Sequence, residues 1–269
     1  RKGNPILGNC GIDMLYIIEN DLLTLSVSTT ACEMHSLKRK GSDYEYLWNG
    51  DPTYWKGRNP LLFPQVSSTS TKTNIIDGKE YPMGNHGFAR NSDFELVSQE
   101  DDKLVFLLKD NEETHKQYPF SFEIYVTYSL KDNSVLIDYE VVNTNDREMP
   151  FGFGLHPGFM ASDGLKESYI TFNNGNKLEL SYELFDKYPT YFEEPTPSSA
   201  TLHTNGHKLT LDFEGFKHLA IWSPKAPFVC IEPWMNLNVR DDRPFEEREE
   251  NIVLDPNTSF KIGYSITVD

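Results

Sequence analysis

The chain has 269 residues and a formal net charge of −16, with a pI near 4.8. Such an acidic surface repels phosphate backbones, so we expect no nucleic-acid partner. No apolar run reaches the roughly 20 residues that a membrane-spanning helix needs, so we expect no membrane partner either.

Short runs of β-forming residues follow one another along the chain, separated by clusters of Gly, Pro, Asn and Asp. We expect strands at residues 22–28, 94–97, 104–108, 120–128, 135–141, 209–213, 219–222, 228–231 and 260–268. The clearest run is 120–128, in which large apolar residues alternate with mostly polar ones. Residues 135–141 repeat this pattern after the turn at 131–133, which predicts an antiparallel hairpin.

Helical patterns are scarce in this sequence. Residues 182–188 could form one short helix, which Pro189 would end. The chain contains no internal repeat and no low-complexity linker that would separate domains. We therefore expect one all-β domain over residues 1–269, built from stacked antiparallel sheets.

The three cysteines, Cys10, Cys32 and Cys230, are odd in number and far apart. This pattern does not suit the disulfide framework of a small secreted domain, so we expect reduced thiols and a cytoplasmic protein. Cys230 stands close to a glutamate and has a possible catalytic role, although a buried structural thiol is the favoured interpretation.

Three segments carry residues that a strand would not need for packing alone. Residues 85–90 place His86 and Arg90 around a glycine, and residues 151–159 hold His156 among glycines and aromatic rings. Residues 229–234 form an apolar strand that ends in Glu232, Pro233 and Trp234. Each segment alone has an ordinary structural explanation, but the three together favour a site.

These segments resemble the signature segments of the aldose 1-epimerases, the galactose mutarotase family. The matching strings are His-Gly-Phe-Ala-Arg at 86–90, Leu-His-Pro-Gly-Phe at 155–159 and Cys-Ile-Glu-Pro-Trp at 230–234. The order and spacing of the strings also agree. Leu47-Trp48 with Asp51, Trp55 and Leu62-Phe63-Pro64 resembles a bacterial branch associated with lactose operons, and the resemblance runs from about residue 18 to residue 268.

The resemblance implies a large antiparallel β-sandwich, the galactose mutarotase-like supersandwich, and a set of site residues. It implies Glu232 as general base, His156 as general acid, and His86 as a second histidine on the sugar. Arg58 resembles the arginine of the family's sugar site. The further substrate-binding candidates are Arg90, Phe88, Phe159 and Trp234.

Two positions depart from the pattern of many relatives. Ser67 stands where they have Gly after the Leu-Phe-Pro segment, and Thr30-Ala31 stands where they have Gly-Ala. The departures bear on the shape of the loops and not on the catalytic trio.

The implied reaction is the exchange of the α and β anomers of a hexose. A base removes the proton from the hydroxyl on C1 while an acid protonates the ring oxygen, so that the ring opens and then closes on its other face. A carboxylate and an imidazole suit these two tasks near neutral pH. Because the roles reverse on closure, the reaction needs no cofactor and no metal, and the partner is a hexose.

Three alternatives remain open at this point. His86, His156 and Glu232 are also a possible metal-ligand set, although their long spacing disfavours it. A non-catalytic sugar-binding module would carry similar aromatic and polar residues. Within the family, a hexose 6-phosphate could be the substrate, with Arg90 and Lys56 binding the phosphate. The sequence allows a monomer or a homodimer.

Overall fold

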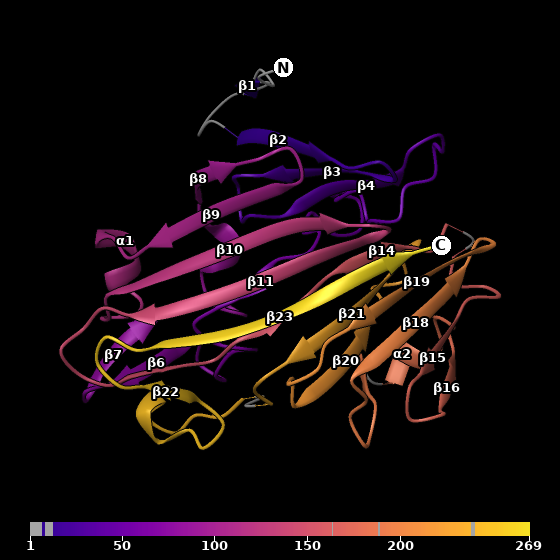
Figure 1. Ribbon diagram of the computed structural model, residues 1–269. Coiled ribbons are helices and arrows are strands. Elements are labelled where there is room, and N and C mark those ends of the chain that lie inside the picture. The colour runs from indigo at the N-terminus through magenta and orange to yellow at the C-terminus, as the bar shows by residue number, and fades with distance from the viewer. Residues whose placement is uncertain (1–6, 9–12, 163, 188, 238–239) are drawn as a thin grey trace.

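The computed structural model describes residues 7–8, 13–162, 164–187, 189–237 and 240–269 (Figure 1). Within these ranges the chain is almost entirely strand, and its helical segments are all short, which confirms the all-β prediction. Cys10 and Tyr188 lie outside the described residues. In the part of the chain that is described, no helix combines the length and apolar character that crossing a membrane requires.

The largest sheet has nine strands in the order β16-β15-β18-β19-β23-β11-β10-β9-β8. Figure 1 shows the C-terminal strand β23, in yellow, crossing the middle of this sheet between β11 and β19. The strands are β8 (Glu95–Gln99), β9 (Lys103–Lys109), β10 (Phe122–Lys131), β11 (Ser134–Asn143), β15 (Tyr169–Phe172), β16 (Lys177–Glu179), β18 (Ser199–Thr204), β19 (His207–Asp212) and β23 (Ser259–Val268).

The hairpin of β10 and β11 is the element that the sequence predicts best. The two strands pair without a break from Phe122 with Asn143 to Lys131 with Ser134, which leaves Asp132 and Asn133 as the turn. Along β10 the side chains alternate between buried and half-exposed until the exposed end at Lys131. This alternation follows from the pleat, because successive side chains of a strand point to opposite faces of the sheet.

A six-stranded sheet carries two of the three segments that the sequence analysis singled out, whereas residues 85–90 lie outside its strands and meet its edge at the bridge of Gly87 with Phe63. Its path is β17-β20-β21-β13-β5, and β14 also pairs with β21. The strands are β5 (Leu61–Leu62), β13 (Gly154–Leu155), β14 (Gly158–Met160), β17 (Thr190–Phe192), β20 (His218–Trp222) and β21 (Phe228–Trp234).

The two large sheets share one hydrophobic core. The ring of Phe153, next to β13, lies 5.5 Å from Tyr139 of β11 and 5.7 Å from Phe260 of β23, measured between centroids. Ile231 of β21 and Ile266 of β23 belong to the same buried cluster. The strands of the smaller sheet are therefore buried against the larger sheet, as expected for a β-sandwich.

The remaining strands form smaller sheets, and the helical segments are short. A four-stranded sheet contains β1 (Leu7–Gly8), β2 (Asp13–Glu19), β3 (Leu23–Ser28) and β4 (Met34–Arg39), and two strand pairs contain β6 (Thr73–Ile76) with β7 (Lys79–Pro82) and β12 (Met149–Phe151) with β22 (Ile252–Leu254). The helical segments are α1 (Glu112–His115), α2 (Leu184–Lys187), η1 (Ala89–Asn91) and η2 (Phe245–Glu247). The helix expected at 182–188 is thus present but shorter.

Candidate active site

Strand pairing brings His156 opposite Glu232. Gly154 of β13 pairs with Trp234 of β21, and Gly158 of β14 pairs with Cys230 of the same strand. His156 lies halfway between the two glycines, and Glu232 lies halfway between their partners. Two segments that are 76 residues apart therefore present one imidazole and one carboxylate to each other, because residues opposite one another in an antiparallel pair are neighbours.

The two side chains form a close and buried pair. The Nε2 atom of His156 lies 3.3 Å from Oε1 of Glu232. His156 is 7% exposed and Glu232 is 1% exposed. Among the described residues, two buried polar atoms lack a hydrogen-bond partner of normal geometry, and both are in this region: Nδ1 of His156 and Nε1 of Trp234. Free polar atoms of this kind are typical of a site that is completed by a ligand.

Burial acts on the two pKa values in opposite directions. It raises the pKa of Glu232 well above its usual value, although the nearby Trp234 indole and the charge of Arg90 oppose this rise. Burial, together with His86 and Arg90, lowers the pKa of His156 well below 6.5. Burial therefore favours a protonated Glu232 and a neutral His156. This neutral pair holds the same single proton as an ion pair of Glu232 and His156 would.

His86 follows β7 in a left-handed backbone conformation, with φ of 65°. Its backbone N–H donates to the Ser67 carbonyl, and its Nδ1 accepts from the Ser67 N–H, both at 2.9 Å. An accepting Nδ1 leaves the proton of the neutral ring on Nε2. Burial and the charge of Arg90 lower the pKa of His86 to about 3, so the ring stays neutral. The centroids of the His86 and His156 rings are 5.6 Å apart.

The turn at Gly87 attaches His86 to the β5 region. The N–H groups of Phe88 and Ala89 both donate to the Phe63 carbonyl. A Cβ atom on Gly87 would lie 2.2 Å from that carbonyl oxygen, so only glycine fits. Ser67, which stands where many relatives have Gly, adopts a positive φ of 64°, and Ala31, which follows the departure at Thr30, adopts one of 56°. The left-handed turns at these positions are thus formed by non-glycine residues.

Arg58 and Arg90 share one electrostatic neighbour, the buried carboxylate of Glu33. Oε1 of Glu33 accepts from the backbone N–H of Arg58 at 2.8 Å and of Asn59 at 2.9 Å. The electrostatic neighbours of the half-buried Arg90 include Glu33 and Glu232. The Arg90 guanidinium makes no hydrogen bond or ion pair with any described residue, so it is free to bind a ligand. Glu33 was not among the sequence candidates, because a single glutamate after a strand carries no recognisable signal.

Two tryptophans that the sequence analysis gave no role border the pair. The ring of Trp55 lies 4.8 Å from the His156 ring, and that of Trp222 lies 5.4 Å from it, measured between centroids. Both indoles are half-buried. Trp222 pairs with Cys230 across β20 and β21, so a correct strand alignment would have predicted its place. Trp234, a sequence candidate, lies 5.9 Å from the His86 ring.

Two other aromatic candidates belong to the core instead. Phe159 is fully buried in the central hydrophobic cluster. Phe88 packs against Phe63 and Phe122, with centroids 6.1 and 5.9 Å apart. The alternative of core packing therefore describes these two rings better than contact with a sugar.

The described residues also contain a group with metal-ligand spacing. It consists of His156, Cys230 and Glu232, whose donor atoms all lie within 4.8 Å of one another. His86 is not part of this group, so it differs from the ligand set considered from the sequence. Burial raises the pKa of the Cys230 thiol well above its usual value, which disfavours a catalytic thiolate.

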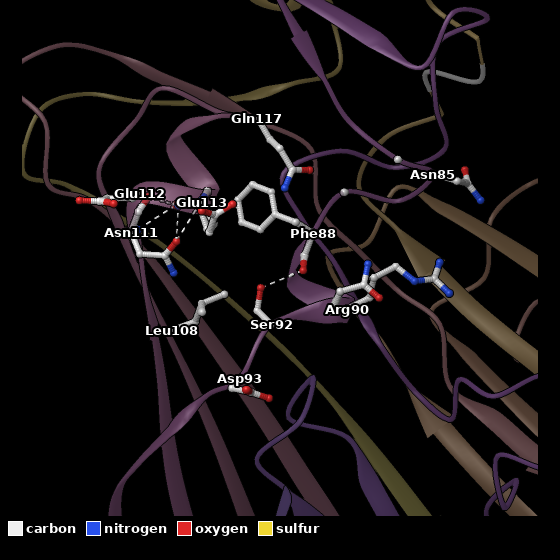
Figure 2. Close-up of a pocket in the computed structure, with 14 residues that line it drawn as sticks. Asn85, Phe88, Arg90, Ser92, Asp93, Leu108, Asn111, Glu112, Glu113 and Gln117 are labelled. Atoms are coloured by element: carbon white, nitrogen blue, oxygen red, sulfur yellow. Dashed lines mark hydrogen bonds between the residues drawn. The ribbon is translucent and has the colours of Figure 1, made fainter. Parts of the chain in front are cut away.

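A cavity of about 930 Å³ lies next to the site, between η1 and α1 (Figure 2). Its lining includes Asn85, Phe88, Arg90, Asn111 and Gln117 but none of the catalytic trio. Figure 2 shows the Arg90 side chain directed toward the side of Asn85 and away from the helix that follows Asn111. The side chains of His86, His156 and Glu232 therefore do not line this cavity, although Asn85, Gly87 and Arg90 of the segment around His86 do.

Comparison with known proteins connects this geometry to a family. The family model for aldose 1-epimerase matches residues 14–258. The plasmid-encoded protein LacX of Lactococcus lactis subsp. lactis is 29% identical, and the match covers 95% of this chain and 99% of that protein.

Solved structures agree in fold. A galactose mutarotase related enzyme from Lactobacillus acidophilus superimposes with a TM-score of 0.87 and 32% identity, covering 95% of this chain and 97% of that one. A galactose mutarotase-like protein from Lactobacillus casei gives a TM-score of 0.85 and 29% identity, covering 95% and 100%. These matches confirm the resemblance that the three sequence strings indicate. The chain therefore belongs to the aldose 1-epimerase family.

Proposed function

We propose that this protein is an aldose 1-epimerase, an isomerase that interconverts the α and β anomers of a free hexose. The observation that carries the proposal is the buried pair of Glu232 and His156, with 3.3 Å between Oε1 and Nε2. The hydroxyl oxygen on C1 and the ring oxygen are both bonded to C1. An acid and a base that are this close to each other can therefore reach both oxygens of one sugar.

The reaction needs one transferable proton on either Glu232 or His156. The neutral pair carries it on Glu232, and the ion pair carries it on His156. In the reactive form, Glu232 is ionised and takes the proton of the C1 hydroxyl, while protonated His156 donates to the ring oxygen. The C1–ring oxygen bond breaks and an aldehyde forms. Rotation about C1–C2 and the reverse transfers then give the other anomer. The neutral form that burial favours converts to the reactive form when one proton moves from Glu232 to His156.

The other side chains support binding of a sugar. Neutral His86 presents its Nε2–H as a donor, since Ser67 occupies Nδ1. The unpaired guanidinium of Arg90 stabilises negative charge on Glu232 and can donate to sugar hydroxyls. Trp55 and Trp222 offer apolar surface to the C–H face of the ring. We assign Arg58 a place at the edge of this site.

The test includes a hexose 6-phosphate because the unpaired guanidinium of Arg90 is a candidate to bind its phosphate. Polarimetry on freshly dissolved α-glucose, α-galactose and α-glucose 6-phosphate measures the reaction directly, since catalysis speeds the approach to the equilibrium rotation. We expect faster mutarotation of at least one free hexose. If the protein accelerates mutarotation of the phosphate ester alone, its substrate is a hexose 6-phosphate and not a free hexose. If it accelerates mutarotation of none of these sugars, the proposal of an epimerase is refuted in favour of a non-catalytic sugar-binding protein.

The buried thiols bear on the compartment of this protein, and the hydrophobic core bears on its domain organisation. Cys32 and Cys230 are buried and unpaired, which supports a reducing compartment, and we propose the cytoplasm. The core cluster includes residues from both large sheets. This supports a single structural unit over the length of the chain.

A further inference from the structure

We propose that His156, Cys230 and Glu232 form a binding site for a soft divalent metal ion, Zn²⁺ in the first place, and that the bound ion excludes the sugar. The ion would be an inhibitor and not a cofactor, because it would occupy the two groups that move protons. The proposed metal site is supported by the positions of these three side chains alone. Only the expected effect of the ion on turnover rests on the proposed function.

The donor set is the one that zinc prefers. The site offers one imidazole nitrogen, one sulfur and one carboxylate oxygen, whereas Mg²⁺ and Ca²⁺ prefer oxygen donors alone. Three protein ligands leave one position open, as in zinc sites that are not purely structural.

The distances are compatible with tetrahedral coordination. Zinc bonds of about 2.0 to 2.3 Å place neighbouring donors roughly 3.3 to 3.7 Å apart. The His156 and Glu232 donors are already 3.3 Å apart, and all three donors lie within 4.8 Å of one another. Adjustments of about 1 Å at the side-chain torsions would complete the site.

The backbone holds the donors on one side of the sheet. Cys230 and Glu232 are two residues apart on β21, so their side chains point to the same face. Gly158 pairs with Cys230 and brings no side chain between the thiol and His156. A Cβ atom at position 158 would lie 3.4 Å from the Cys230 sulfur.

An independent observation points to a ligand at this place. His156 is more than nine-tenths buried, and its Nδ1 has no hydrogen-bond partner. No second hydrogen bond therefore fixes the ring, and a small adjustment of the side chain can direct a nitrogen at an ion. Histidines of permanent metal sites almost always donate their other N–H to a carbonyl or a carboxylate. The lack of that support here predicts reversible binding that a chelator removes.

Coordination replaces two protons, which leave to solvent. One comes from the Cys230 thiol, and the other is the proton that Glu232 and His156 hold between them. No electron is transferred, and the only bonds formed are those from the metal to sulfur, nitrogen and oxygen.

The binding experiment uses chelator-treated full-length protein and Zn²⁺ alone. We expect the wild-type protein to bind Zn²⁺ at this site, and both Cys230→Ser and His156→Gln to weaken that binding by at least about 100-fold. Cys32→Ser is the matched control, because Cys32 is also a buried free thiol. Co²⁺ in place of Zn²⁺ should give a thiolate charge-transfer band that Cys230→Ser abolishes, whereas Mg²⁺ and Ca²⁺ should not bind there.

The second part of the experiment measures mutarotation in the presence of Zn²⁺. Zn²⁺ should raise the apparent KM of the wild-type protein for the hexose, and Cys230→Ser should turn over normally but resist the ion. Wild-type protein that binds no Zn²⁺, or Cys230→Ser and wild type with equal Zn²⁺ affinity, overturns the proposed site. If Cys230→Ser does not fold, Cys230→Ala and the Co²⁺ band of the wild type decide. Zn²⁺ binding in a protein without mutarotation would refute the proposed function and leave the metal site intact.

Discussion

Strands β10 and β21 use the same backbone geometry for different purposes. β10 alternates buried apolar residues with half-exposed ones, so each polar side chain reaches water. All seven residues of β21 are buried, including Cys230 and Glu232. A carboxylate in such a place costs stability unless a partner or a ligand compensates it. The contrast teaches that a strand with one wet face follows the period-two pattern, as β10 does, and that the strand which carries Glu232 departs from it.

The largest effect should come from replacing Glu232 of β21, compared with the same replacement of a glutamate in β10. Glu232→Gln removes the proposed base, and we expect kcat to fall by roughly 10²- to 10⁴-fold while sugar affinity changes little. Glu123→Gln is the matched control on β10, where the carboxylate is half-exposed and lies 3.5 Å from Lys109. Polarimetry and a direct sugar-binding assay measure both. Equal losses in the two variants, or loss of binding alone in Glu232→Gln, would refute the distinction.

A second comparison concerns two glycines with the same φ of 74°, Gly87 at the site and Gly78 in the turn of β6 and β7. Alanine at either position strains the backbone by about 1 kcal/mol or more. Only Gly87→Ala also forces a Cβ against the Phe63 carbonyl, so we expect a total loss of about 3 kcal/mol or more. Gly78 has no atom within 4 Å of an added Cβ. Urea unfolding of the two variants should differ, and equal midpoints would contradict the close approach.

The third comparison is between two histidines. The folded pKa of His86 is about 3, below its usual 6.5, so on acidification the unfolded chain binds a proton before the folded chain does. The free energy of unfolding should therefore fall as the pH drops, by about 2 kcal/mol between pH 7 and pH 5 from this group. His86→Asn should remove that part of the slope. Asparagine tolerates positive φ and can still accept from Ser67.

His115→Asn serves as the control for this measurement, since His115 is the more exposed histidine and belongs to α1. Denaturant unfolding at several pH values gives the slopes. A slope of His86→Asn equal to that of the wild type would show that the folded protein protonates His86 as readily as the unfolded chain.

The smallest effect should come from replacing one of two aromatic residues, Trp222 beside the pair of His156 and Glu232 or Phe159 in the core. Trp222→Leu removes indole surface next to His156, and we expect KM to rise about tenfold with little change in kcat. Phe159→Leu should instead lower the free energy of unfolding by about 1 kcal/mol and leave KM unchanged. Steady-state kinetics and thermal unfolding of both variants test this. An unchanged KM in Trp222→Leu would remove that indole from the sugar site.

Much of the fold was predictable because its strands alternate. The hairpin of β10 and β11 and the strand β23 lie close to where the pattern predicts them. Strands such as β2 and β4 were not predicted, because their side chains lack a regular alternation of burial. Their positions depend on partners elsewhere in the chain.

The pairing of Glu232 with His156 was predictable from the motifs, but the aromatic surroundings of the pair were not. Phe88 and Phe159 were chosen because they stand near His86 and His156 in the sequence. Neighbours along an extended chain point to opposite faces, so Phe159 points into the core. Trp222 reaches His156 from another strand instead. Only the alignment of strands and the fold of the loop that carries Trp55 could have revealed these contacts.

His156 lies between two short strands that pair with the same edge of β21, and this placement has a consequence for how the protein can change. The spacing of the proton donor and acceptor is set by paired main chain, whereas Trp55, Arg58 and the segment of Arg90 are carried on connecting loops. Changes to the loop that carries Trp55 and Arg58 should therefore alter which aldose fits while the paired main chain keeps His156 and Glu232 in place, whereas changes at Arg90 would also alter the pKa values of both groups. Under the proposed function we expect substrate preference to depend on that loop and proton transfer to depend on the paired strands, so libraries restricted to the loop that carries Trp55 and Arg58 should retain turnover.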